Sequence, residues 1–183
     1  MSREIALLPK EKMKILGHFD FRYFYKQLYI GLNRDGWTVK EKRYVEKAKP
    51  GAEKKDIEIE WVATLPVDSY TMAKMEIFFE IKDSHEPMTE WKGGITRPIF
   101  EGIFEMKFYY HLVLDYQNKW AANPLLKQMQ NFYERRIYKR NLELIKEEHW
   151  KNGWDYIKNI KELLGGIAIH EVAPIHEIPL RED

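Results

Sequence analysis

Apolar and polar residues alternate over three stretches of the chain, 56–65, 70–82 and 99–115. This is the pattern of strands that bury one face. In the last stretch every even position from Phe100 to Leu114 is apolar except Gly102. A glycine inside such a row predicts a bend or bulge in the strand.

Two further strands are expected. Residues 13–19 can form a short strand, and residues 37–47 carry Lys40, Lys42 and Lys47 between apolar residues, as in a solvated edge strand. No helix-length segment separates the strands from 37 to 82, so neighbours in sequence should pair antiparallel. We therefore predict an α+β fold. It has an antiparallel sheet of four to five strands packed against a short N-terminal aromatic helix and a long C-terminal helical segment.

The N-terminal helix is expected to begin after Asp20, a favourable N-cap, and to end at about Arg34, with Gly36 beyond it. Its apolar residues recur three and four positions apart and so share one helical face: Phe21, Phe24, Tyr25, Leu28 and Leu32. Such a face predicts packing against the core.

The C-terminal segment begins with Asn123 and Pro124, a cap followed by proline at the first helical position. One helix is expected over 124–146, with Phe132 buried in its core-facing row. Asn152 and Gly153 predict a break, and a second amphipathic piece should then run to Gly165 and Gly166.

Two other segments contain helix and strand breakers. Residues 83–97 hold Pro87 and the pair Gly93 and Gly94, and are predicted to be a mobile loop with Trp91 near its tip. Residues 1–166 are expected to form one domain, followed by an extended tail over 167–183 that repeats Ile-His-Glu. The tail either docks on the edge strand 37–47 or is a disordered terminus.

Composition agrees with a folded domain, because 44% of the 183 residues are hydrophobic and a chain of this length buries roughly 70% of its unfolded surface. The 30 Lys and Arg residues nearly balance 29 Asp and Glu residues, so binding to nucleic acid or anionic membrane must be local. Cysteine is absent, which excludes disulfides and thiolate chemistry and fits the cytoplasm. The apolar run at 5–9 is too short for a signal or a membrane span.

Four segments together resemble a family of small archaeal α+β proteins of unassigned function: FDFRYFYKQLYIGL at 19–32, GWTVKEKRYVEK at 36–47, DIEIEWVAT at 56–64 and LDYQNKWAANPLLKQMQNFYERRI at 114–137. The resemblance covers most of the chain and departs from it at 83–97 and in the tail. It implies the same fold and a cytoplasmic setting. The matching residues are those of strands, aromatic packing and a helix start, so it implies no catalytic residue.

Catalytic and metal signatures are weak. The six histidines include no pair four residues apart beside a helical Glu, so neither a metal nor another cofactor is expected. Alternation places Glu41 and Arg43 on the same face of their strand as Trp37, Val39 and Val45, where they either line a pocket or form an ordinary ion pair. Glu101, Glu105, Lys107 and His111 are explained equally well by salt bridges across strands.

Three functions stay open. The first is a non-enzymatic binding or assembly module for an unknown protein partner or for self-association. The second is a carrier, or an enzyme, with an apolar ligand cavity between sheet and long helix, lined by Met75, Phe79, Phe104, Met106, Phe108 and Tyr110. The third is an RNA-associated factor whose helix binds polyanions through Lys127, Arg135, Arg136, Lys139 and Arg140.

Overall fold

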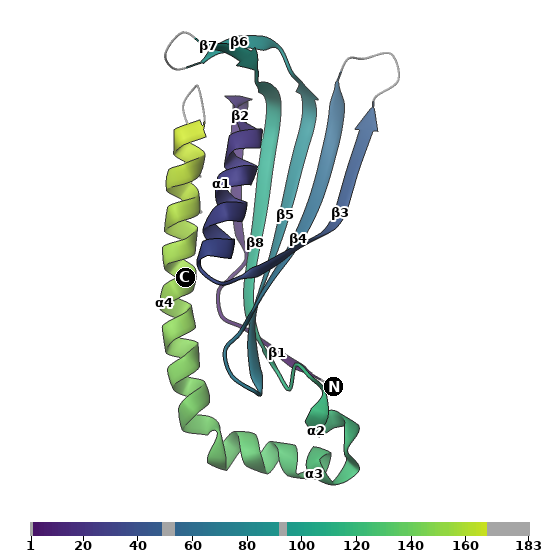
Figure 1. Cartoon of the computed structure of the whole chain (residues 1–183), viewed down its shortest axis with the longest axis vertical. Coiled ribbons are helices and arrows are strands. Elements are labelled where there is room, and N and C mark those ends of the chain that lie inside the picture. The colour runs from purple at the N-terminus through teal and green to yellow at the C-terminus, as the bar shows by residue number, and fades with distance from the viewer. Residues whose placement is uncertain (1, 49–53, 92–94, 168–183) are drawn as a thin grey trace, which may run out of the picture.

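The computed structural model describes residues 2–48, 54–91 and 95–167 of the chain. It has an α+β architecture in which two helices cover one face of an antiparallel sheet (Figure 1). The strands are β1 (Arg3–Ala6), β2 (Glu11–Phe19), β3 (Thr38–Ala48), β4 (Lys55–Pro66), β5 (Thr71–His85), β6 (Met88–Trp91), β7 (Ile95–Pro98) and β8 (Phe100–Leu114). The helices are α1 (Phe21–Arg34), α2 (Lys119–Ala122), α3 (Pro124–Phe132), the π-helix η1 (Tyr133–Ile137) and α4 (Lys139–Ile167). The predicted fold class is confirmed.

The main sheet has six strands in the order β3, β4, β5, β8, with β1 and β2 both paired to β8. β1 pairs with the end of β8 and β2 with its beginning, so the two behave as one edge strand that is interrupted at residues 7–10. The sequence did not predict β1. Leu8 leaves the sheet in this interruption and is buried. β3 forms the opposite edge of the sheet, as its lysines predicted.

α1 forms where its cap predicted. The Asp20 side chain accepts a hydrogen bond from the Tyr23 backbone N–H over 3.0 Å, and the helix ends before Gly36, which has a φ of 87°. Phe21, Phe24, Leu28 and Leu32 are buried against the sheet. Asn123 likewise caps α3, because its side chain accepts hydrogen bonds from the backbone N–H groups of Leu125 and Leu126 in the first turn.

The C-terminal helical segment breaks at a different place from the one predicted. α3 ends at Phe132, η1 follows, and Tyr138 precedes α4, which changes the chain direction at this point (Figure 1). α4 then runs without a break through Gly153 and includes Gly165 and Gly166. The glycines do not interrupt it because a helix interior tolerates glycine at a cost of about 1 kcal/mol, which packing can offset.

Gly153 is buried, and it lies so close to the sheet that no side chain would fit there. A Cβ at this position would lie 2.6 Å from both Leu8 Cδ1 and Tyr110 Cδ1. The glycine therefore lets α4 approach the sheet at the interruption between β1 and β2. The prediction of a break at this residue is wrong for this packing reason.

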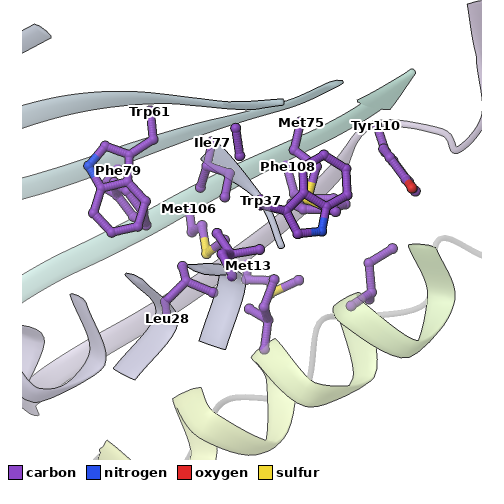
Figure 2. Packing of buried hydrophobic residues seen from close by; sticks show 14 of the residues in the cluster. Met13, Leu28, Trp37, Trp61, Met75, Ile77, Phe79, Met106, Phe108 and Tyr110 are labelled. Carbon is purple, nitrogen blue, oxygen red and sulfur yellow. The ribbon is translucent and has the colours of Figure 1, made fainter. Parts of the chain in front are cut away.

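The core lies between the sheet and the two helices (Figure 2). Trp61 and Phe79 meet edge to face at 5.2 Å, and Trp37 meets Tyr110 at 5.8 Å. α4 contributes Leu142, Ile145, Ile157, Ile160, Leu164 and Ile167. Phe132, in contrast, is 58% exposed, so its predicted burial is wrong: it belongs to α3, which does not lie along the sheet.

The predicted mobile loop at 83–97 is also wrong in part. β5 continues to His85, and β6 and β7 pair antiparallel as a separate two-stranded sheet. Gly102 lies opposite the register shift of β5 between Lys82 and His85, and a Cβ there would be 2.7 Å from the Lys82 carbonyl oxygen. The irregularity expected at Gly102 is thus present, mainly in the partner strand. The tail from 168 onward lies outside the described residues.

Candidate groove between α1 and β3

β3 carries polar residues on the inner face of the sheet, beyond the area that α1 covers. Its register shifts between Glu41 and Arg43, so Lys42 is an extra residue opposite β4. Glu41 pairs with Trp61, Tyr44 with Ile59 and Glu46 with Ile57, and these three partners in β4 are all buried. Glu41, Tyr44 and Glu46 therefore share the inner face of the sheet.

This bulge corrects the face predicted for Arg43 and Val45. Arg43 pairs with Glu60 and Val45 with Glu58, both on the outer face of the sheet. The Arg43 guanidinium lies 3.0 Å from a Glu58 carboxylate oxygen, so Arg43 forms a surface ion pair. Glu41 alone of the predicted pair faces inward.

A groove with a volume of about 530 Å³ lies between α1 and this part of the sheet. Its apolar floor consists of four buried side chains: Phe21, Ile57, Ile59 and Phe100. Its rim consists of Arg22, Tyr25, Glu41, Tyr44, Glu46, Lys55 and Glu86. We call these residues the α1–β3 groove. Most of them belong to α1, β3 and β4, whose arrangement Figure 1 shows.

One wall of the groove is a hydrogen-bonded chain that reaches into the core. Trp61 Nε1 donates to the Tyr25 hydroxyl over 3.1 Å, and that hydroxyl donates to a Glu41 carboxylate oxygen. Burial, together with the bond to Glu41, raises the pKa of Tyr25 to about 12. Tyr25 therefore stays protonated, and Glu41 is held at the surface of the groove.

The opposite wall is an ion-pair chain. Lys55 Nζ lies 3.1 Å from Glu46 Oε1 and 3.2 Å from Glu86 Oε1, and Arg22 Nη2 lies 2.5 Å from Glu86 Oε2. Partial burial opposes the charge on Lys55, but the hydrogen bonds to Glu46 and Glu86 outweigh it and raise its pKa. Both cations also lie about 6 Å from the Phe100 ring, over its face.

A second cavity, between α1 and α4, is lined by Leu28, Leu32, Tyr156, Ile160 and Leu163 among others. Its volume is about 120 Å³, well below the roughly 300 to 1,000 Å³ typical of sites for small molecules. The α1–β3 groove falls within that range.

The structure places the sequence-predicted cavity residues elsewhere. Met75, Phe79, Phe104, Met106, Phe108 and Tyr110 are at most 1% exposed and form the centre of the core. Neither of the two cavities is lined by them. The strand residues that line the α1–β3 groove belong to β3, to β4 and to the beginning of β8.

The polyanion-binding candidates are all exposed, but on three different elements. Lys127 is on α3, Arg135 and Arg136 are on η1, and Lys139 and Arg140 begin α4. Four of them therefore lie at the bend between α3 and α4, and Lys127 lies in the first turn of α3, so the five do not share one straight helix.

The acidic residues of β8 contact basic side chains of the neighbouring strands. Glu105 Oε2 lies 3.0 Å from Lys12 Nζ, and Glu101 Oε2 lies 3.2 Å from His85 Nε2. In the ranges that the structure describes, no cluster of three or more His, Asp or Glu side chains is placed to hold a metal ion.

Most of the groove could not be found from sequence. Glu41 was a candidate, but Tyr25 was assigned to the core, and Arg22, Tyr44, Glu46, Lys55 and Glu86 gave no signal. They come from α1, β3, β4 and the segment after β5, and only the fold brings them together.

Comparison with known proteins identifies no relative: no family model, no curated protein and no solved structure matches this chain. Among the helices that the structure describes, none is long and apolar enough to cross a membrane. The α1–β3 groove itself is therefore the basis for a functional proposal.

Proposed function

We propose that this protein is a non-enzymatic binding module that takes an amphipathic small organic molecule into the α1–β3 groove. The observation that carries the proposal is the groove's construction, with an apolar floor that belongs to the core and a charged rim on two sides. Sites for small molecules combine these features, since apolar walls give affinity and a few fixed polar groups give orientation.

The floor supports an apolar or aromatic ligand body. Phe21 packs against Phe79 at 5.9 Å and Phe100 at 6.0 Å, and Ile57 and Ile59 lie in the first half of β4. These side chains are held by core neighbours on their far side. The floor is therefore preorganised, which lowers the entropic cost of binding.

The rim supports recognition of a polar ligand group. Glu41 accepts from Tyr25, and within the described part of the chain no Lys or Arg lies within ion-pair distance of it. Its carboxylate keeps acceptor capacity toward the groove. A ligand whose polar end donates hydrogen bonds, such as an amine or an alcohol, matches this wall.

Two groups of the rim, Tyr25 and Lys55, are suited to binding and not to acid–base chemistry. A general acid or base works best with a pKa near the ambient pH. Tyr25 has a pKa of about 12, and the pKa of Lys55 is raised above its ordinary value. Neither group exchanges its proton near neutrality, so both serve as fixed hydrogen-bonding and charged groups.

The test is binding of the neutral fluorescent dye Nile red to the full chain and to a variant with a filled groove. Ile57→Trp places a larger side chain in the floor and should weaken dye binding by at least about tenfold. Val62→Trp is the matched control, because Val62 is in the same strand but faces outward, paired with Lys40. Mass spectrometry of solvent extracts from protein purified from its own cell would identify the native ligand.

Equal dye binding by the two tryptophan variants and the wild type would contradict the proposal, as would the absence of dye binding to the wild type. Thermal midpoints of both variants show whether each is folded.

A further inference from the structure

The bend between the sheet domain and α4 carries a concentrated positive charge. We define the basic arm as residues 119–140, which comprise α2, α3, η1 and the start of α4. It contains six basic residues, Lys119, Lys127, Arg135, Arg136, Lys139 and Arg140, and one acidic residue, Glu134. The rest of the chain has 24 basic and 28 acidic residues, so its net charge has the opposite sign.

The one acidic residue does not offset this charge at the surface. Glu134 is buried, its carboxylate accepts a hydrogen bond from the Tyr70 hydroxyl over 2.6 Å, and it lies 2.8 Å from Arg3 Nη1. It therefore faces the sheet domain. The outer surface of the arm is cationic, and the exposed carboxylate of Glu143 just beyond it lies 3.9 Å from Lys139 Nζ.

The same arm exposes a row of large apolar side chains. Leu125, Met129 and Phe132 are spaced four and three residues apart, which places them on one face of α3, and they are 66%, 49% and 58% exposed. Arg136 follows Phe132 by four residues and lies in η1, and Ile137 beside it is 64% exposed. α3 has no buried residue.

The two features together identify the class of surface that the arm fits. Cationic side chains alone suit any polyanion, including RNA. Aliphatic side chains such as Leu125 and Met129 gain nothing from a phosphate backbone, whereas an amphipathic helix on a bilayer buries such residues at the acyl boundary. A symmetric contact between the arms of two copies is disfavoured, because two cationic arms repel each other.

The position of α3 permits a flat approach. α3 lies across one end of the molecule, at the opposite end from β6 and β7, and turns sharply into α4 (Figure 1). Its inner side contacts the sheet domain through Gln130, whose Nε2 donates to the Tyr70 hydroxyl over 3.0 Å. The apolar row is therefore presented outward by a helix that is fixed to the domain.

We propose that the basic arm docks the protein on the surface of an anionic lipid bilayer. Leu125, Met129 and Phe132 enter the boundary between head groups and acyl chains, and Arg136, Lys139 and Arg140 bind lipid phosphate and carboxylate groups. The helix lies on the bilayer and does not cross it. This interaction is separate from ligand binding in the α1–β3 groove, which lies toward the other end of the sheet.

The test is co-sedimentation of the full chain with vesicles of phosphatidylcholine, with and without phosphatidylserine. Wild type should sediment with the vesicles that contain phosphatidylserine, and less so as salt is raised. The double variant Leu125→Ser, Phe132→Ser should bind at least about tenfold more weakly, because it removes exposed apolar area and leaves the charge unchanged. The double variant Arg136→Glu, Arg140→Glu should not sediment.

Matched controls are Leu16→Ser, at a leucine of β2 that is 50% exposed, and Lys158→Glu, on the exposed side of α4. Both should sediment like wild type. All substituted residues are exposed, so thermal midpoints should be unchanged and a loss of binding is not a loss of fold.

Three results would overturn the proposal: no sedimentation of wild type, equal sedimentation of the serine variant and wild type, or equal binding to both kinds of vesicle. Retention on immobilised RNA that the serine variant keeps and the glutamate variant loses, without vesicle binding, would assign the arm to nucleic acid instead.

Discussion

His149 of α4 is a buried polar residue between helix and sheet. Its Nδ1 lies 2.5 Å from the Tyr110 hydroxyl in a hydrogen bond, and its ring meets the Tyr110 ring at 6.1 Å. Burial lowers the pKa of His149 below the ordinary 6.5 and raises the pKa of Tyr110. The contact is therefore formed by two neutral side chains.

This shift makes stability depend on pH. In the unfolded chain His149 takes up a proton as the pH falls through about 6.5, whereas in the folded protein it does so only at lower pH. Between the two values the unfolded state binds more protons. The contribution of His149 to the free energy of unfolding should therefore be constant above this window and decrease as the pH falls through it.

We expect His149→Asn to reduce this decrease, because asparagine can offer a hydrogen-bonding atom to Tyr110 and does not titrate. Urea unfolding at a series of pH values from neutral downward measures the slope. His111 is the comparison, since burial also lowers its pKa and its contribution has the same sign. A slope in His149→Asn equal to that of wild type would show that His149 does not contribute, and His111→Asn would then be expected to remove it.

Residue-scale chemistry in the groove was only partly accessible from sequence. Alternation placed Glu41 on the inner face of its strand, and the structure has it there, paired with Trp61. Tyr25 was read as a core aromatic, and its ring does pack on Trp61 at 4.4 Å. The Tyr25 hydroxyl, however, reaches the groove. Periodicity cannot predict this, because it assigns a whole side chain to one face and does not distinguish its ring from its hydroxyl.

At the scale of elements, α4 shows how packing overrides local propensity. It spans 29 residues and three glycines, and its interior glycine, Gly153, lies against Leu8 and Tyr110. Alanine is the better helix former by about 1 kcal/mol. At position 153, however, α4 lies so close to the sheet that only glycine fits.

Gly153→Ala should therefore destabilise the protein, by about 1 to 3 kcal/mol from overpacking less the gain in helix propensity. The Tyr110 ring is fixed in the core, so the helix must move outward. Thermal and urea unfolding would measure the change.

Gly31→Ala is the matched control, because a Cβ at this residue in the last turn of α1 has no atom within 4 Å. It should stabilise the fold by about 0.5 to 1 kcal/mol. A stabilised Gly153→Ala variant would mean that α4 does not contact the sheet as closely as described.

At the scale of the whole molecule, the basic arm is joined to the sheet domain through one polar and aromatic cluster. The Tyr138 hydroxyl donates to Asp68 Oδ2 and the Tyr70 hydroxyl to Glu134 Oε1, each over 2.6 Å. Burial, with these carboxylates next in importance, raises the pKa of both tyrosines. Trp120 and Tyr133 pack around Tyr70 at 5.8 and 5.5 Å.

Tyr70→Phe should loosen the arm more than the domain. The variant removes the hydrogen bond to the buried Glu134 carboxylate, worth about 1.5 to 3 kcal/mol. Amide hydrogen exchange should become faster in α3 and η1, while the central strands β5 and β8 change less.

Tyr29→Phe is the control, because Tyr29 is exposed and its hydroxyl has no hydrogen bond in the described ranges. Exchange that increases uniformly over the whole chain in Tyr70→Phe would indicate that arm and domain unfold as one unit.

The sequence by itself determined the elements that depend on local rules. Alternation located β4, β5 and β8, Asp20 and Asn123 located two helix starts, and the lysines of β3 marked an edge. These signals work because side-chain direction in a strand and backbone capping at a helix start depend on residues a few positions apart.

Only the tertiary structure decided the features that depend on contacts between distant residues. The bulge at Lys42 reversed the face of Arg43 and Val45, the approach of Leu8 and Tyr110 kept α4 continuous at Gly153, and the turn at η1 left Phe132 exposed. The groove has the same origin, since its residues come from five segments of the chain: α1, β3, β4, the segment after β5, and β8. Local patterns state whether a residue prefers burial, but which neighbour buries it is set by how the elements pack.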